Sequence, residues 1–162
     1  MIRKSEPGDY ERILEIYAIA REFMREHGNP NQWNTKWPPA ELVHEDIEVG
    51  RGYVCEIDGI VEAAFIYIQG VDIDPTYRYI EDGSWLADSE YGAVHRIASS
   101  GNYKRIGEFC ISWAYAQCGH LRMDTHGDNE VMQNLLTKLG FERRGIIYVV
   151  EDDYPRVAYE KI

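Results

Sequence analysis

Residues 91–118, YGAVHRIASSGNYKRIGEFCISWAYAQC, are the part of the chain that indicates its fold. A strand is expected over residues 91–98, because the four residues after it, Ser-Ser-Gly-Asn, favour a turn. From about Tyr103, apolar residues recur at the helical spacing of three and four: Ile106, Cys110, Trp113 and Ala114. The stretch therefore predicts a strand, a tight turn and a helix in succession.

The start of this helix has the features of an anion-binding site. The first N–H groups of a helix lack partners within the helix, and its dipole favours negative charge there. Lys104 and Arg105 add two cations at the same place. The alternative is an ordinary connection whose two cations face water, and these residues alone favour that alternative.

The composition limits the classes of function. The chain has 162 residues, 44% of them hydrophobic, which suits a single globular domain over residues 1–162. Its formal net charge of −11 argues against nucleic acid or an anionic membrane as a partner, since both would repel it. The same charge is compatible with a cationic substrate such as an amine.

The cysteines and the first residues bear on location. Cys55, Cys110 and Cys118 form no C-x-x-C pair, which indicates reduced thiols in a cytoplasmic protein. Neither a signal-peptide pattern at residues 1–10 nor an apolar run of membrane-spanning length is present in the sequence. His126 lies near Asp124 and His120, but the spacing fits no standard set of metal ligands, so no metal is expected.

The remaining pattern predicts a mixed α/β fold. Asp58-Gly59 suits the two-residue turn of a β-hairpin between two β-rich runs. The expected order is strand, helix, helix, hairpin, then strand-helix-strand-helix-strand-strand. The helices are expected over residues 10–27, 40–49, 103–118 and 130–139, and the last two strands over residues 141–151 and 154–162. The strand-helix-strand unit implies local parallel pairing, while the hairpins imply antiparallel pairing and helices on both faces of the sheet.

Two irregular segments carry conspicuous aromatic residues. Trp33 and Trp37 lie in the Pro- and Asn-rich stretch 29–39, and Tyr79 lies in the acidic stretch 70–90. These three side chains are candidates for binding substrate, although large aromatic residues more often pack in a core. A loop as long as residues 70–90 is expected to cover a pocket or to form a dimer contact.

A later helix carries the stronger resemblance to a known family. Residues 129–141, NEVMQNLLTKLGF, resemble the N-x-x-A-x-x-x-Y-x-K-x-G-F helix of the GNAT superfamily of acyl-CoA-dependent N-acyltransferases. The match covers Asn129, Lys138, Gly140 and Phe141. The sequence departs from the motif at Met132 and Leu136. The order of the expected elements is similar to that of the family over essentially the whole chain.

A second motif falls on the turn of the opening stretch. The family's pyrophosphate loop, Q/R-x-x-G-x-G/A, corresponds to residues 102–107, NYKRIG, of which only Gly107 fits. Asn102 replaces Gln or Arg, and Arg105 replaces the first glycine. A side chain at Arg105 must either crowd the phosphates or turn aside.

The resemblance implies a mixed, mostly antiparallel sheet of about six to seven strands and a binding mode for acetyl-CoA. In the family, the strand before the loop offers backbone groups to the pantetheine arm, and N–H groups of the loop hold the pyrophosphate. The implied cofactor-binding residues are Ile97, Ala98, Ser99, Asn102, Tyr103, Lys104, Arg105, Ile106, Gly107 and Glu108, with Asn129, Met132, Leu136 and Lys138 from the later helix.

The resemblance also implies the chemistry, which is direct transfer of an acetyl group from acetyl-CoA to a primary amine in a ternary complex. A base must deprotonate the amine. His95 is the first candidate, because it lies two residues before Ile97 and therefore on the same face of the expected strand, and Glu62 is the second. A purely structural role for His95, satisfied by a neighbouring group, is the alternative. Many family members protonate the leaving thiolate with a tyrosine, but Leu136 occupies that position here. Tyr148 is the candidate that replaces it.

Three hypotheses remain open at this stage. The first is an N-acetyltransferase acting on a small, cationic amine or a peptide amine, and such folds commonly form homodimers. The second is a GNAT-fold protein that binds an acyl-CoA without turnover. The third is an unrelated α/β binding module. The sequence does not identify the acceptor amine.

Overall fold

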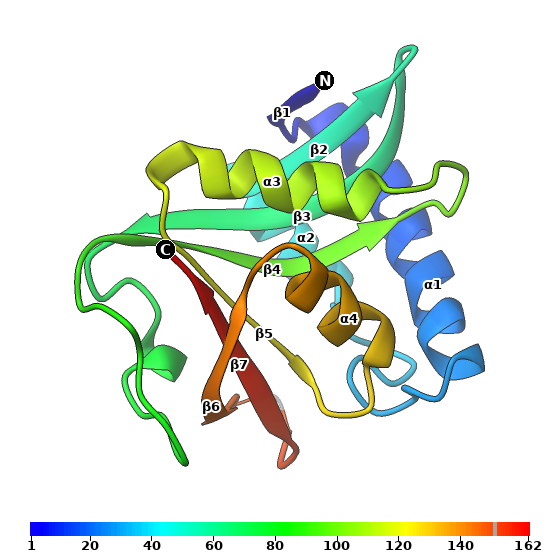
Figure 1. The fold of residues 1–162 in the computed structure, drawn as a ribbon. Helices are drawn as coiled ribbons and strands as arrows, with labels where there is room; N and C mark the ends of the chain where they lie inside the picture. Colours follow the sequence, from blue (N-terminus) through cyan, green and yellow to red (C-terminus); the bar gives the residue numbers. More distant parts are fainter. Residues whose placement is uncertain (151) are drawn as a thin grey trace. The chain divides into compact units, whose positions relative to one another are not determined.

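The computed structural model describes residues 1–150 and 152–162 (Figure 1). Within these residues, hydrogen-bonded strands form a seven-stranded sheet in the order β1-β2-β3-β4-β5-β7-β6, accompanied by four α-helices. This confirms the expected mixed α/β class. The chain divides into two compact units, residues 1–67 with 95–111 and residues 68–94 with 112–162.

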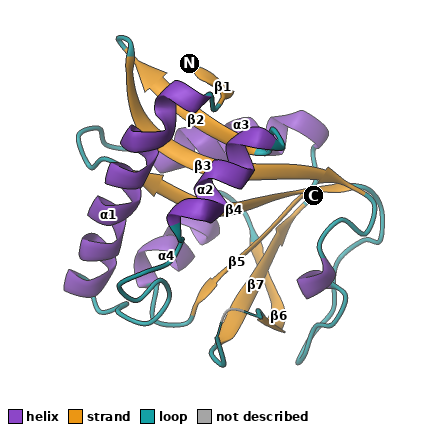
Figure 2. Ribbon diagram, turned by 180° about the vertical axis from the view of Figure 1, so that it is seen from behind, coloured by secondary structure: helices purple, strands orange, loops and turns teal. Residues whose placement is uncertain are grey.

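The first unit contains the N-terminal elements. Its complete elements are β1 (Ile2–Lys4), α1 (Tyr10–Glu26), α2 (Ala40–Glu48) and β2 (Gly52–Ile57). Three elements run through both units: β3 (Ile60–Gly70), β4 (Tyr91–Ser99) and α3 (Ile106–Cys118). Helices α1 and α2, which lie next to each other in Figure 2, end within two residues of the expected positions.

The β2–β3 hairpin has the turn that the sequence predicts. Asp58 and Gly59 have φ angles of 51° and 81°, as a turn with two left-handed residues requires. The two strands pair antiparallel, with Val54 opposite Ala64. The local Asp-Gly signal therefore identifies this hairpin correctly.

Helices contact both faces of β2 within the first unit. Val54 and Ala64 pack in a buried cluster with Ile16 and Val43 of helices α1 and α2. Cys55 points to the other face, because successive strand residues alternate. There the Cys55 thiol lies close enough to the buried Cys110 of α3 for each thiol to affect the pKa of the other.

Asp9 precedes α1 but does not cap it with its side chain; its carboxylate accepts hydrogen bonds from the Arg3 guanidinium and from the Glu6 N–H, at 2.7 and 2.8 Å. One local prediction is wrong. Helix α3 begins at Ile106 and not at about Tyr103. The reason is that Arg105 has a φ of 66°, and a left-handed residue cannot belong to a right-handed helix.

The second unit contains the C-terminal strands. Its complete elements are β5 (Leu121–His126), α4 (Glu130–Lys138), β6 (Glu142–Tyr148) and β7 (Pro155–Lys161). Strand β7 pairs antiparallel with β5 and with β6. Gly92 of β4 pairs parallel with Leu121, as the strand-helix-strand pattern predicts. The strand expected over residues 141–151 already ends at Tyr148, and residue 151 lies outside the described residues.

The long segment 71–90 is anchored within the second unit by a buried charged network, which we call the Glu160 network. Glu160 is fully buried on β7 and interacts with His120 and Arg122 at 2.7 and 3.1 Å. Its other oxygen accepts a hydrogen bond from the Leu86 N–H. The Arg122 guanidinium lies over the Trp85 ring, 4.2 Å from its centroid. These contacts fix the end of the segment against β5 and β7.

A membrane-crossing helix is not found: among the described residues, each helix is too short or too polar to span a bilayer.

Candidate functional site

The turn between β4 and α3 is hydrogen-bonded to a buried carboxylate of the neighbouring strand β3. Glu62 of β3 is 4% exposed, and its Oε2 accepts hydrogen bonds from the Ser100 hydroxyl and, at 3.1 Å, from the Asn102 amide. Arg12 of α1 reaches the same oxygen at 3.4 Å. The Ser100 N–H also donates to the Glu62 carbonyl at 2.9 Å. These hydrogen bonds therefore fix the conformation of the turn that carries the residues predicted to bind phosphate.

These contacts bear on the second candidate base. Three donors converge on a single Glu62 oxygen, so this carboxylate supports the turn through which acetyl-CoA is expected to bind. The contacts favour a supporting role for Glu62, and its role as a base stays a prediction.

Arg105 adopts the backbone conformation that explains why glycine is usual at its position. Its φ of 66° lies in the left-handed region. The side chain turns aside and binds Glu108 of the first α3 turn, with nitrogen–oxygen distances of 2.7 and 3.1 Å. The guanidinium therefore does not crowd the turn, and it partly offsets the charge of the Glu108 carboxylate.

We expect Arg105→Gly to be more stable than Arg105→Ala by about 1 kcal/mol, because only glycine adopts the left-handed conformation without a steric cost. Both substitutions remove the exposed ion pair with Glu108, so their difference isolates the backbone. Urea unfolding measures it. Equal stability of the two variants would contradict the conformation assigned to residue 105.

The residues around this turn differ in their exposure to solvent. Tyr103, Lys104 and Phe109 are exposed, whereas Ile106 is 7% exposed and packs inward. The first N–H groups of α3 belong to Ile106, Gly107 and Glu108, and such groups have no partners within their helix. This is the arrangement of an anion-binding helix start with solvent-accessible cations beside it.

Strand β4 carries His95, Ile97, Ala98 and Ser99, and it is not a regular strand. Arg96 has a φ of 49° in its middle. A left-handed residue interrupts the alternation on which the shared face of His95 and Ile97 was predicted. His95 is half-buried. Its role as base stays a prediction.

The two tryptophans differ in burial. Trp33 is 5% exposed and packs edge-on against Tyr17 of α1, with ring centroids 5.4 Å apart. Trp37 is partly buried against the same cluster. Trp33 therefore serves the core, and Trp37 is the more accessible of the two proposed substrate contacts.

The second unit holds the remaining predicted cofactor residues. Asn129 caps α4 by accepting a hydrogen bond from the Met132 N–H at 3.1 Å, as expected for a helix start. Met132 is half-buried and Lys138 is exposed, but Leu136 is fully buried. Leu136 cannot replace a proton-donating tyrosine, because its side chain has no titratable group.

The structure brings two other predicted residues together at Glu81. The hydroxyls of Tyr148 and Tyr79 donate to the Glu81 carboxylate at 2.6 and 3.2 Å. These hydrogen bonds to a carboxylate raise the pKa of both phenols. Tyr148 is thereby a weaker acid than an ordinary tyrosine, and its role as the proton donor stays a prediction.

His126 is buried, and its Nδ1 accepts a hydrogen bond from the Asp128 N–H at 3.0 Å in the turn before α4. Burial and Arg156 lower the pKa of the imidazole. A search of residues 1–150 and 152–162 finds no group of three or more His, Cys, Asp or Glu side chains placed to hold a metal ion.

Sequence reasoning missed the ion pair between Asp46 of α2 and Arg96 of β4. The Arg96 guanidinium donates to both Asp46 oxygens, at 2.9 and 2.7 Å. One signal was available: Asp46 follows Val43 by three residues and therefore falls on the inward stripe of α2. A carboxylate at a core position indicates a buried cationic partner.

Comparison with known proteins supports the fold. The sequence matches no family model and no curated protein at a significant level. Among solved structures, the chain is similar to a GNAT family acetyltransferase from Streptococcus agalactiae, with a TM-score of 0.82, 28% identity, and coverage of 100% of this chain and 94% of the other.

Two further structures share the fold at lower identity. A ribosomal-protein-alanine N-acetyltransferase from Brucella melitensis has a TM-score of 0.67 and 18% identity, covering 100% of this chain and 99% of that one. A Salmonella typhimurium protein assigned as an acetyltransferase, solved with its cofactor acetyl-CoA, has a TM-score of 0.61 and 16% identity, covering 99% and 91%.

Proposed function

The chain has the fold of the GNAT acetyltransferases over its whole length, and from this premise we propose that it transfers an acetyl group from acetyl-CoA to a primary amine. The observation that carries the proposal is the turn at residues 100–105. Glu62 fixes the turn through its hydrogen bond with Asn102, and the left-handed Arg105 redirects the chain into α3. The N–H groups at the start of α3 can then bind an anion.

The cofactor would be held mainly by this chain's backbone. N–H groups at the start of α3 would bind the pyrophosphate, and the exposed Lys104 would add a cation beside it. Arg105 is engaged by Glu108, so it would contribute less than its charge suggests. Acetyl-CoA, when bound, supplies the activated thioester.

The chemical steps require a base, an oxyanion donor and a proton for the thiolate. The amine would lose its proton to His95, directly or through water, before it attacks the thioester carbonyl. A backbone N–H of β4 would stabilise the tetrahedral oxyanion. Collapse of this intermediate breaks the carbon–sulfur bond and releases CoA as a thiolate, which Tyr148 or water would protonate.

The acceptor is proposed to be a small cationic amine, because the net charge of the chain is −11 and the segment 71–90 is rich in acidic residues. A cytoplasmic location is proposed on the basis of the three free cysteines. The alternative function is acyl-CoA binding without turnover, which the leucine at position 136 favours.

Calorimetric titration with acetyl-CoA tests the cofactor, with CoA and dephospho-CoA as reference ligands. We expect saturable binding, weakened about threefold to tenfold in Lys104→Ala, which removes a cation beside the phosphates. Lys4→Ala is the matched control, since Lys4 is also exposed but lies on β1. Absence of binding at millimolar ligand would contradict the proposal.

An amine panel with thiol detection then separates the two functions. Acetyl-dependent release of CoA thiol in the presence of an amine supports the transferase. Tight binding without thiol release from any amine supports the acyl-CoA-binding alternative.

A further inference from the structure

Arg96 has a backbone conformation that its residue type disfavours. Its φ of 49° places it in the left-handed region in the middle of a β-strand, where a side chain with a Cβ is strained. Glycine would adopt this conformation without cost. Strained residues persist only where surrounding contacts determine them, so the contacts of the Arg96 side chain need an explanation.

The Arg96 side chain is held by a buried carboxylate on α2. Asp46 is 4% exposed at its side chain, and both of its oxygens accept from Arg96 Nη2. Arg51 also donates to Asp46 through its Nε. Burial raises the pKa of the nearby Tyr17 phenol on α1, and the charges of Arg96 and Asp46 act on it in opposite directions. We call Asp46 and Arg96 the Asp46–Arg96 clamp.

The clamp is not optimised for stability. Among the described residues, Arg96 Nε is buried without a hydrogen-bond partner, which costs free energy. Buried ion pairs also contribute little net stability once the desolvation of both charges is counted. Arg96 adds a strained backbone and an unpartnered donor, so a contribution to stability does not explain its presence. The position that it imposes on β4 is the better explanation.

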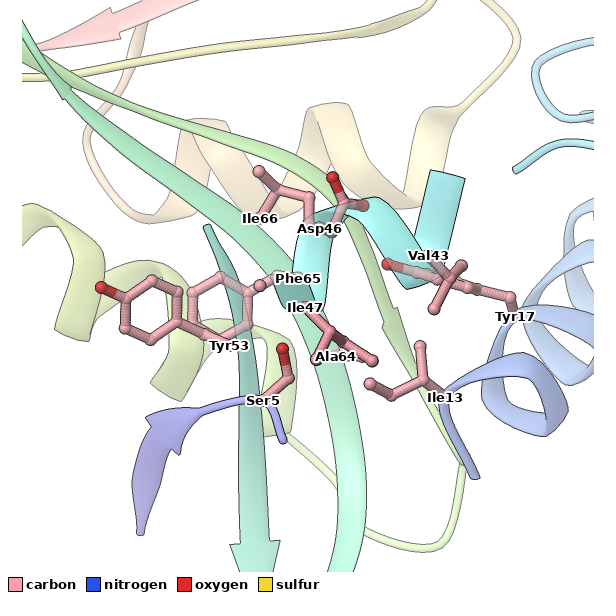
Figure 3. A pocket seen from close by; sticks show the side chains of 11 residues that line it. Ser5, Ile13, Tyr17, Val43, Asp46, Ile47, Tyr53, Ala64, Phe65 and Ile66 are labelled. Atoms are coloured by element: carbon pink, nitrogen blue, oxygen red, sulfur yellow. The ribbon is translucent and has the colours of Figure 1, made fainter. Parts of the chain in front are cut away.

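Asp46 has no room to bind a substrate itself. The cavity beside it, shown in Figure 3, is about 10 Å³ in volume and is lined by side chains such as Tyr17, Val43, Ile47 and Phe65. That volume holds about one water molecule. Asp46 therefore acts through Arg96, not by direct contact with a ligand.

We propose that the Asp46–Arg96 clamp is a positioning device that holds β4 in its bent conformation, so that the backbone groups of Ile97 and Ala98 face bound acetyl-CoA. The proposal rests on the proposed function, because it assigns those backbone groups to the cofactor and to the oxyanion. It makes Asp46 and Arg96 positioning residues, not catalytic ones. The physical basis is that a bulge-like bend redirects the N–H groups that follow it.

Two double variants separate backbone position from loss of charge. Asp46→Asn/Arg96→Gly and Asp46→Asn/Arg96→Ala both remove the clamp, but only glycine adopts the left-handed conformation freely. We expect the glycine variant to stay within about threefold of the wild type in acetyl-CoA affinity and kcat. The alanine variant and Asp46→Asn alone should lose about tenfold, the equivalent of the left-handed cost for a residue with a Cβ.

The readouts are acetyl-CoA dissociation constants by calorimetry, kcat, and the amide chemical shifts of residues 95–98 in the free protein. Equal values for the glycine and alanine variants would overturn the proposal, since an ion pair that only stabilises the fold does not distinguish them. If Asp46→Asn does not fold, Arg96→Gly and Arg96→Ala provide the same comparison, because Arg51 still pairs with Asp46.

The design distinguishes this inference from the proposed function. If the wild type turns over and the glycine and alanine variants have the same kcat and acetyl-CoA affinity, the positioning role of the clamp is refuted and the transferase function stands. The opposite result is also possible: no amine supports turnover, but only the glycine variant keeps the amide shifts and the acetyl-CoA affinity of the wild type. In that case the positioning role of the clamp stands and the transferase function is refuted.

Discussion

Replacing His95 with glutamine is expected to lower kcat by about 10²–10⁴-fold, the usual contribution of a general base. His95 lies on β4 next to the left-handed Arg96, in the segment expected to hold the pantetheine arm. Glutamine is similar in size and polarity but cannot accept the amine proton. The fold should therefore be retained while the chemical step is lost.

The pH–rate profile gives this prediction a sharper test. An imidazole base is active only when neutral, so the wild-type kcat/KM should fall on the acid side of neutrality. In His95→Gln this acid limb should disappear. His44→Gln is the matched control, since His44 is exposed on α2 and should leave both kcat and the profile unchanged. An unaltered acid limb in His95→Gln would remove His95 as the base.

Glu160→Gln is expected to cause the largest loss of stability, about 3–5 kcal/mol, because it leaves the Arg122 guanidinium in a buried site without an anion. Glu160 is fully buried and contacts Arg122 and His120 in the Glu160 network. Guanidinium chloride unfolding measures the loss. The variant should also expose the segment 71–90 to limited proteolysis, since the Leu86 N–H loses its carboxylate acceptor.

A neighbouring glutamate provides the control for this experiment. Glu142 lies directly opposite Glu160 in the register of β6 and β7, but its side chain is 64% exposed and pairs with Arg144 at the surface. Surface ion pairs contribute about 0–1 kcal/mol, so Glu142→Gln should be nearly neutral. Similar losses in the two variants would show that burial of the Glu160 network is not the cause.

The local elements of the site could be predicted because each depends on a few adjacent residues. The Asp58-Gly59 hairpin, the turn after β4 and the Asn129 cap of α4 follow from turn and capping chemistry that acts within four residues. The helix begins at Ile106, later than the position near Tyr103 that the apolar spacing predicts. The side-chain pattern does not reveal that Arg105 takes a left-handed conformation.

The sequence by itself determined the class of fold, because hydrophobic periodicity and turn residues are local properties. The segment expected to bind the cofactor follows from the family resemblance and stays a prediction. The tertiary structure alone decided what the charged residues do. Glu62 meets Asn102 and Asp46 meets Arg96 at separations of 40 and 50 residues along the chain. Burial of a charge requires a partner, but which partner depends on how strands and helices pack, and no pattern of adjacent residues encodes that choice.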